Sequence, residues 1–164
     1  PHVGVDIVAD AKKIPIADNS IGSLVCNNLL EHVDKPKVVI DEVLRILVPG
    51  GLAYFDIPFM YPFHSSPDDF NRWTTKGLRK IFESFEIKEI GLRSGPFSTI
   101  CVNTSYALAT SFCLGKEKLF WPLLHIFMIL LFPLKFLDYL VMKVPQAMHS
   151  AGVYYLILKK PNND

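Results

Sequence analysis

Short apolar runs, each ended by polar or turn-forming residues, recur along the chain and predict the strands of a sheet. Their β-branched and aromatic side chains are typical of strands. The run at residues 21–26 is continuously apolar, as expected for a buried strand. The predicted strands are residues 3–9, 21–26, 52–57, 85–92 and 153–158.

Amphipathic segments between these runs predict helices. Apolar residues recur at helical spacing over residues 35–47, where Asp34 is the expected N-cap and Pro36 suits the first turn. The turn Pro49-Gly50-Gly51 is expected to end this helix. Further helices are expected over residues 75–84, after an N-cap at Thr74, and over residues 98–114. Strands that alternate with helices predict an α/β fold with a mostly parallel sheet, which binds ligands at the carboxyl ends of its strands.

Composition narrows the function classes. Half of the 164 residues are hydrophobic, which excludes a disordered chain and leaves apolar surface for a ligand, a partner or a membrane. The net charge of +1, without a cluster of basic residues, does not indicate nucleic-acid binding. Three cysteines without a CxxC pair argue against a disulfide scaffold or a zinc ribbon. Reduced thiols and the lack of an opening secretory signal predict a cytoplasmic protein.

Three motifs occur in a fixed order along the first third of the chain. They read Asp10-Ala11-x-x-Ile14-Pro15-Ile16-x-Asp18-x-Ser20, Asn28-Leu29-Leu30-Glu31-His32-Val33 and Arg45-Ile46-Leu47-Val48-Pro49-Gly50-Gly51. In this order and spacing they resemble the central part of class I S-adenosylmethionine-dependent methyltransferases of the type 11 group. The resemblance covers residues 3–95 and returns at 151–159.

The resemblance implies a Rossmann-like methyltransferase sheet of order 3-2-1-4-5-7-6, in which strand seven is antiparallel. The five predicted strands then correspond to strands three to seven, so we expect a chain without the first two strands. Such a chain would hold half of the cofactor site and would be inactive alone. We expect residues 1–95 and 151–160 to form the partial methyltransferase domain, and residues 96–150 to be an apolar helical insertion.

The resemblance also implies S-adenosylmethionine as cofactor and assigns residues to it. Asp10 would accept a hydrogen bond from the adenine amino group, and the backbone of Ala11 would meet a ring nitrogen. Asn27, Asn28 and Leu29 would line the methionine end. Each of these residues also has a purely structural interpretation, as part of an ordinary turn after a strand.

A loop follows residues 52–57 and carries the pattern His64-x-x-Pro67-x-Asp69-x-x-Arg72-x-Thr74. It resembles a loop in a subset of these methyltransferases that is often found among glycan and cell-envelope genes. His64 and Asp69 are candidate catalytic residues, and Arg72 is a candidate acceptor-binding residue. A structural Asp–Arg pair that closes the loop is the alternative.

Other side chains near this loop have candidate roles. His32 is a second candidate base, because histidine exchanges protons near neutral pH. Phe59 and Tyr61 are expected to contact the acceptor. His64 with Asp68 and Asp69 lacks the ordered spacing of a metal site, so no metal is predicted.

Residues 119–134 read LFWPLLHIFMILLFPL and contain a single polar side chain, His125. The run is short for a membrane span and lies between two strands of one sheet, which a single span would separate. We therefore expect a helical hairpin at the inner membrane surface. A homodimer interface through residues 119–142, or a lid over an apolar acceptor, is the alternative.

The sequence thus predicts methyl transfer from S-adenosylmethionine to an acceptor that is apolar or a lipid-linked glycan. The alternative function, from another class, is a non-catalytic module for membrane association or dimerisation on a methyltransferase scaffold.

Overall fold

The computed structural model describes residue 4, residues 6–64 and residues 67–162. Its first half contains β1 (Ile21–Asn27), the 3-10 turn η1 (Leu30–His32), α1 (Pro36–Ile46), β2 (Leu47–Pro58), α2 (Thr75–Ile81) and β3 (Glu86–Ser94). Its second half contains α3 (Pro96–Phe112), α4 (Glu117–Leu131), η2 (Phe132–Leu137), α5 (Asp138–Val141), η3 (Pro145–Ser150) and β4 (Val153–Lys159).

The strands form one sheet in the order β1-β2-β4-β3. β1 pairs with β2 in parallel, while β4 runs antiparallel to both β2 and β3. Three strands therefore share one direction and β4 opposes them. This is the 4-5-7-6 part of the expected methyltransferase sheet, so the predicted α/β fold with an antiparallel last strand is confirmed.

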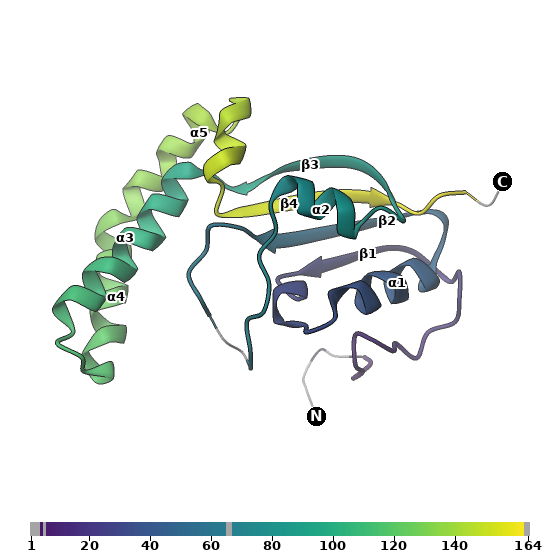
Figure 1. The fold of residues 1–164 in the computed structure, drawn as a ribbon, viewed down its shortest axis with the longest axis horizontal. Helices are drawn as coiled ribbons and strands as arrows, with labels where there is room; N and C mark the ends of the chain where they lie inside the picture. Colours follow the sequence, from purple (N-terminus) through teal and green to yellow (C-terminus); the bar gives the residue numbers. More distant parts are fainter. Residues whose placement is uncertain (1–3, 5, 65–66, 163–164) are drawn as a thin grey trace.

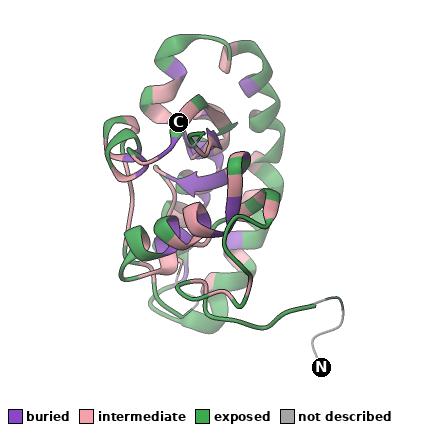
Figure 2. Cartoon of the chain, turned by 90° about the vertical axis from the view of Figure 1, so that its right-hand side faces the viewer, coloured by how far each residue is buried: buried purple, intermediate pink, exposed green. Residues whose placement is uncertain are grey.

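α1 and α2 lie over the same face of the sheet (Figure 1). The core forms on this face, because alternate residues of β2 and β4 point toward the two helices. Phe55 of β2 and Phe82 after α2 are fully buried, with ring centroids 5.0 Å apart. Buried residues gather where the sheet meets its helices (Figure 2).

The prediction of a strand over residues 3–9 is wrong for residues 6–9, which belong to no strand, while residues 3 and 5 lie outside the described part. In the expected order this strand pairs only with strand two, and no described residue supplies that neighbour. A lone strand leaves its backbone groups without partners. The predicted burial of 21–26 is also wrong, because β1 is an edge strand and Val25 is 67% exposed.

The helix predicted over residues 35–47 forms as α1 over Pro36–Ile46. The predictions made for its two ends, however, are wrong. Lys35, not Asp34, occupies the N-cap position, and Asp34 instead lies 3.7 Å from Lys12 Nζ. β2 begins at Leu47, so the turn at residues 49–51 lies inside the strand rather than ending the helix. Gly50 there adopts a φ of 77°, which glycine tolerates without strain.

The N-termini of α2 and α3 are each capped by a side chain. Thr74 caps α2 as predicted, because its hydroxyl accepts a hydrogen bond from Gly77 N at 3.2 Å. α3 begins at Pro96, earlier than the predicted residue 98. Its first turn is capped from α5, where Asp138 accepts hydrogen bonds from Phe97 N and Ser98 N at 2.8 and 3.0 Å.

α3 and α4 lie side by side at the end of the sheet away from the C-terminus (Figure 1). The segment that contains them leaves from β3 and returns into β4, and these two strands are neighbours in the sheet. The helical stretch Glu117–Val141 spans 25 residues and is long and apolar enough to cross a membrane, and 6% of its most apolar window is buried in the protein.

Candidate functional site

A cavity of about 440 Å³ opens at the carboxyl ends of β1 and β2. Three structural regions contribute its walls: the strand ends, the loop after β2, and the helical segment through α3 and η2. Its lining residues include Asn28, Asp56, Tyr61, His64, Arg93, Ser98 and Lys135. Polar and cationic groups therefore gather at the sheet edge where the sequence predicts a site.

The floor of this cavity is built by two residues at the strand ends. Asn28 has a φ of 45°, a conformation that asparagine tolerates better than most residues. Its backbone N donates to Asp56 O at 3.2 Å. The Asp56 carboxylate is 4% exposed and accepts from Tyr54 Oη at 2.6 Å and from Arg93 Nε at 3.0 Å. Sequence reasoning missed Asp56 and Arg93, because their pairing depends on strand register.

The loop between β2 and α2 is held by a buried ion pair. Asp69, with a side chain 2% exposed, receives two hydrogen bonds from the Arg72 guanidinium and one from His64 N at 3.0 Å. Arg72 also donates to the carbonyl oxygens of Asn71 and Pro62. The hydrogen bonds from Arg72 lower the pKa of Asp69 to about 2. Asp69 is thus a buried anion that binds the backbone of His64 and the side chain of Arg72.

Glu31, His32 and His64 come together beside the cavity. Glu31 Oε1 lies 3.8 Å from His32 Nε2 and 3.9 Å from His64 Nε2. The two imidazole rings meet edge to face, with centroids 5.0 Å apart. Burial raises the pKa of Glu31, whose side chain is fully buried. The sequence identified both histidines as candidate catalytic residues, but no signal in it predicted that the Glu31 side chain would be buried beside them.

The predicted cofactor residues lie along one side of the sheet end. Asp10, Ala11 and Leu29 line a hollow of about 470 Å³ together with His32 and Phe70. An adjoining apolar groove beside β1, of about 500 Å³, is lined by Asn27 and again by Ala11 and Leu29. Asn28 faces the cavity described above instead. The structure therefore brings the five predicted residues to one region of the sheet edge.

Asp10 forms a tight turn at the rim of that hollow. Its carboxylate accepts from Lys12 N at 2.9 Å, and Lys12 Nζ lies 4.0 Å from its other oxygen. The side chain is 62% exposed, so it retains acceptor capacity toward the hollow. Leu29 and Phe70 supply apolar walls. A carboxylate at the rim of an apolar hollow suits a planar heterocycle that carries an amino group.

The first and third motifs are joined by one side chain, Arg45. Its guanidinium donates to Ile14 O, Ile16 O and Asp18 Oδ1 at 3.0, 2.8 and 2.5 Å, and to both carboxylate oxygens of Glu42. Glu42 in turn accepts from Ile14 N at 2.6 Å. The fixed spacing of these motifs is thus explained by the docking of the loop at 14–18 onto α1.

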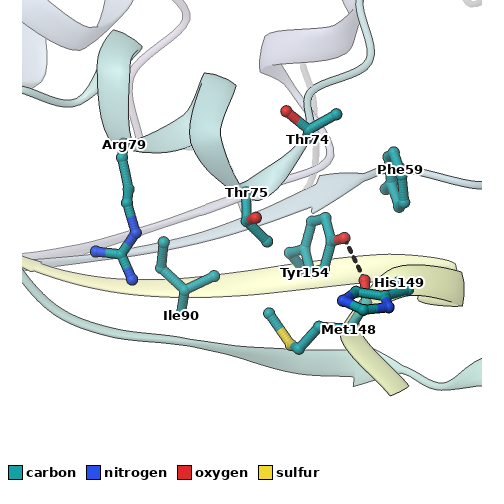
Figure 3. Close-up of a pocket in the computed structure, with 8 residues that line it drawn as sticks. All are labelled: Phe59, Thr74, Thr75, Arg79, Ile90, Met148, His149 and Tyr154. Carbon is teal, nitrogen blue, oxygen red and sulfur yellow. Dashed lines mark hydrogen bonds between the residues drawn. The ribbon is translucent and has the colours of Figure 1, made fainter. Parts of the chain in front are cut away.

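A second cavity of about 440 Å³ lies on the helix-covered face, between α2, the sheet and η3 (Figure 3). Phe59, Tyr154 and Met148 line it, and Tyr154 Oη donates to Met148 O at 2.6 Å. Phe59 and Tyr154 stack at 5.3 Å between ring centroids. Of the two aromatic residues predicted to contact an acceptor, Phe59 faces this second cavity and Tyr61 faces the one at the strand ends.

Comparison with known proteins gives independent information on the family. Residues 2–55 match the family described as "Methyltransferase domain". The demethylmenaquinone methyltransferase of Renibacterium salmoninarum is 37% identical over 65 residues, which cover 37% of this chain and 27% of that protein. The ubiquinone/menaquinone biosynthesis C-methyltransferase of Desulfotalea psychrophila is 46% identical over 44 residues, 27% of this chain and 18% of that protein. The matches thus span about a quarter or less of these relatives.

Solved structures extend the comparison over nearly the whole chain. Phosphoethanolamine N-methyltransferase 2 of Haemonchus contortus, in complex with phosphomonomethylethanolamine and S-adenosylhomocysteine, superposes with a TM-score of 0.57 at 14% identity. That match covers 94% of this chain and 37% of the other. The [4+2]-cyclase SpnF superposes with a TM-score of 0.54 at 19% identity, covering 94% of this chain and 55% of the other. Residues 2–55 thus match the methyltransferase domain family, and the chain has the fold of a class I S-adenosylmethionine-dependent methyltransferase.

Proposed function

We propose that this chain is part of an enzyme that transfers the methyl group of S-adenosylmethionine to an apolar or lipid-linked acceptor at a membrane surface. The observation that carries the proposal is the convergence of Asp10, Ala11 and Leu29 on one hollow at the carboxyl end of the sheet. In a parallel α/β sheet this edge is where ligands bind. The family match over residues 2–55 supports the same function.

The residues around the hollow suit the adenosine part of the cofactor. The exposed Asp10 carboxylate would accept from an exocyclic amino group, and Leu29 and Phe70 would contact the ring faces. The cofactor supplies an electrophilic methyl group on a positively charged sulfur. The residues of this chain would bind it, orient it and exclude water, because positioning and desolvation account for most of such a displacement.

The cavity lined by Asn28, Tyr61 and His64 is the proposed acceptor site. It adjoins the cofactor hollow through the turn at residues 28–32. An acceptor atom held there would attack the methyl carbon as the carbon–sulfur bond breaks, and the leaving group would be S-adenosylhomocysteine. His64 is the candidate group for accepting a proton from the acceptor, while Asp69 and Arg72 hold the loop that carries it.

The helical segment supports an acceptor of apolar character. Large apolar side chains on α4, η2 and α5 face outward: Ile126, Ile129, Leu130, Phe132, Phe136 and Leu140 are each between 49% and 75% exposed. A contiguous apolar surface of this kind marks a membrane or protein contact. We propose a lipid bilayer as its occupant, because Trp121 and Tyr139 stand exposed beside it and suit interfacial depth. Lys135 and Ser98 link this surface to the acceptor cavity.

Two measurements test the proposal, both made on the full-length enzyme of which we propose this chain to be a part. Calorimetric titration with S-adenosylhomocysteine should show binding that Asp10→Ala weakens, while Asp41→Ala, an exposed aspartate of α1, leaves it unchanged. His64→Ala should lower turnover and leave this affinity unaltered. Absence of binding at millimolar ligand would favour the non-catalytic scaffold instead.

Flotation with anionic lipid vesicles tests the membrane contact. The full chain should float with the vesicles, and the double variant Ile129→Ser, Leu140→Ser should remain in solution. A chain that forms dimers and ignores vesicles would identify the same surface as a homodimer interface.

A further inference from the structure

The fully buried carboxylate of Glu31 has no partner in the part of the chain that the structure describes. Neither Glu31 Oε1 nor Oε2 accepts a hydrogen bond there. A buried, unpaired carboxylate is unfavourable, so it is neutralised by a proton, a counter-charge or a ligand. The nearest groups are the Nε2 atoms of His32 and His64, at 3.8 and 3.9 Å, which is too long for a hydrogen bond.

The other nitrogen of each imidazole fixes which atom faces the carboxylate. His32 Nδ1 lies 2.5 Å from Asp68 O, and His64 Nδ1 lies 3.1 Å from Pro62 O. A carbonyl oxygen only accepts, so a proton on Nδ1 satisfies the contact of His32. His64 Nδ1 has two acceptors nearby, Pro62 O and Asp69 Oδ2 at 3.1 and 3.4 Å, and one donor, Arg72 Nη2, at a longer 3.5 Å. The two acceptors favour a proton on Nδ1 of His64 as well. In the neutral rings each Nε2 therefore presents a lone pair toward Glu31. When Glu31 is ionised, three electron-pair donors thus lie together.

The charged side chains that the structure describes around Glu31 do not supply it with a hydrogen-bonded positive partner. Arg72 binds Asp69 and backbone carbonyl oxygens, and its Nη2 lies 3.5 Å from His64 Nδ1, but it does not hydrogen-bond to Glu31. Burial raises the pKa of Glu31, so its ionised form is favourable only beside a positive charge. A divalent ion would supply this charge and satisfy the unpaired carboxylate at once.

We propose that Glu31, His32 and His64 form a binding site for a late first-row divalent transition ion, for which Zn²⁺ is the probe. Their ligand atoms all lie within 4.8 Å of one another. Two ligand atoms bound to a tetrahedral zinc ion at about 2.1 Å are about 3.4 Å apart. The separations of 3.8 and 3.9 Å between Glu31 Oε1 and the two histidines must therefore shorten by about half an ångström. The carbonyl partners of both Nδ1 atoms are the outer contacts that orient histidine ligands.

The ligand set favours zinc-like ions over magnesium. Two imidazoles with one carboxylate are typical of zinc sites that retain an open coordination position, whereas Mg²⁺ prefers oxygen ligands. His64 also lines the cavity at the strand ends, so the proposed site borders that cavity. An oxygen of a water or of a bound hydroxyl compound would complete the coordination. The site stands on these contacts alone and does not depend on the proposed methyl transfer.

Titration of the chelator-treated full chain with Zn²⁺ tests the proposal. We expect one ion per chain, retained in the presence of excess Mg²⁺. His32→Ala and His64→Ala should each weaken binding at least about 100-fold, since removing even an outer contact of a ligand costs 10–100-fold. His125→Ala is the matched control, because it removes an imidazole from α4 that hydrogen-bonds within its own helix.

Co²⁺ provides a second readout that a structural role for the histidines would not produce. Tetrahedral coordination should give intense visible absorption, which His64→Ala abolishes while circular dichroism shows a folded chain. Glu31→Gln keeps the side-chain size and should also weaken Zn²⁺ binding. Failure to bind at millimolar Zn²⁺, or equal binding by the wild type and both histidine variants, would overturn the proposal. Binding of S-adenosylhomocysteine is measured separately and is unaffected by this outcome.

Discussion

We predict that Asp138→Ala lowers the free energy of unfolding, by an amount that follows from the two hydrogen bonds that Asp138 accepts. This aspartate of α5 is 5% exposed and accepts from Phe97 N and Ser98 N, which are otherwise unpaired groups in the first turn of α3. Hydrogen bonds to a charged group contribute about 1.5–3 kcal/mol each. Asp138→Ala removes both, and water reaching the helix end recovers part of the loss. We therefore use the lower value and expect a loss of about 3 kcal/mol.

Thermal and urea unfolding of the full chain, followed by circular dichroism, measure this loss. About 3 kcal/mol corresponds to a decrease in Tm of about 6–12 °C for a domain of this size. Asp138→Asn retains one acceptor oxygen and should cost about half as much. Hydrogen exchange should show faster exchange of the Phe97 and Ser98 amides in Asp138→Ala.

The exposed Asp41 is the matched control, because among the described residues it pairs only with Lys37 on the surface of α1. Asp41→Ala should cost less than about 0.5 kcal/mol. If Asp138→Ala destabilised the chain no more than Asp41→Ala, the assignment of Asp138 as the long-range cap of α3 would be refuted.

Three further predictions concern the sheet and the motif loops. Arg45→Lys loses the bidentate contact with Glu42 and the carbonyl contacts to residues 14–18, so limited proteolysis should cleave that loop sooner; unchanged cleavage would contradict the role of Arg45. Hydrogen bonds from Arg45 lower the pKa of Glu42 from 4.5 to about 2, so Glu42 stabilises the fold above pH 4.5 and loses this effect as the pH falls toward 2. Urea unfolding of Glu42→Gln should be less sensitive to pH in that window, and an identical profile would exclude the linkage. Gly91→Ala places a Cβ 2.4 Å from the Tyr155 ring and should lower the free energy of unfolding, measured by chemical denaturation, by about 1–3 kcal/mol. In a Tyr155→Ala background the same substitution should cause no such loss.

The sheet was predictable because its strands are marked locally. The apolar runs that became β1, β2, β3 and β4 carry the pattern in their own residues, and the resemblance supplied their order. The run at 3–9 carries a similar pattern but forms no strand over residues 6–9. Strand formation depends on a neighbour, and apolar patterning within one segment does not reveal whether that neighbour is present.

The candidate site was predictable only in its outline. His32, His64 and Asp69 stood out as titratable residues in marked motifs, but their partners depend on how two loops dock. Phe70 N and Asn71 N donate to Glu31 O, which fixes the loop of His64 against the turn of His32. Contacts between segments this distant in the sequence leave no local signal, so the inward position of Glu31 and the commitment of Asp69 to Arg72 appear only in the folded chain.

β4 occupies an interior position of the sheet although it is the last described strand along the chain. β2 and β3 therefore cannot join one sheet until residues 153–159 are available. On the ribosome, elongation at about 5–20 residues per second leaves several seconds between the synthesis of β3 and that of β4. The apolar helices are made in that interval, so their capture by a surface would precede closure of the sheet. During synthesis of this fold, the apolar helices can therefore bind to a surface before β4 completes the sheet, while the edges of β2 and β3 are still unpaired.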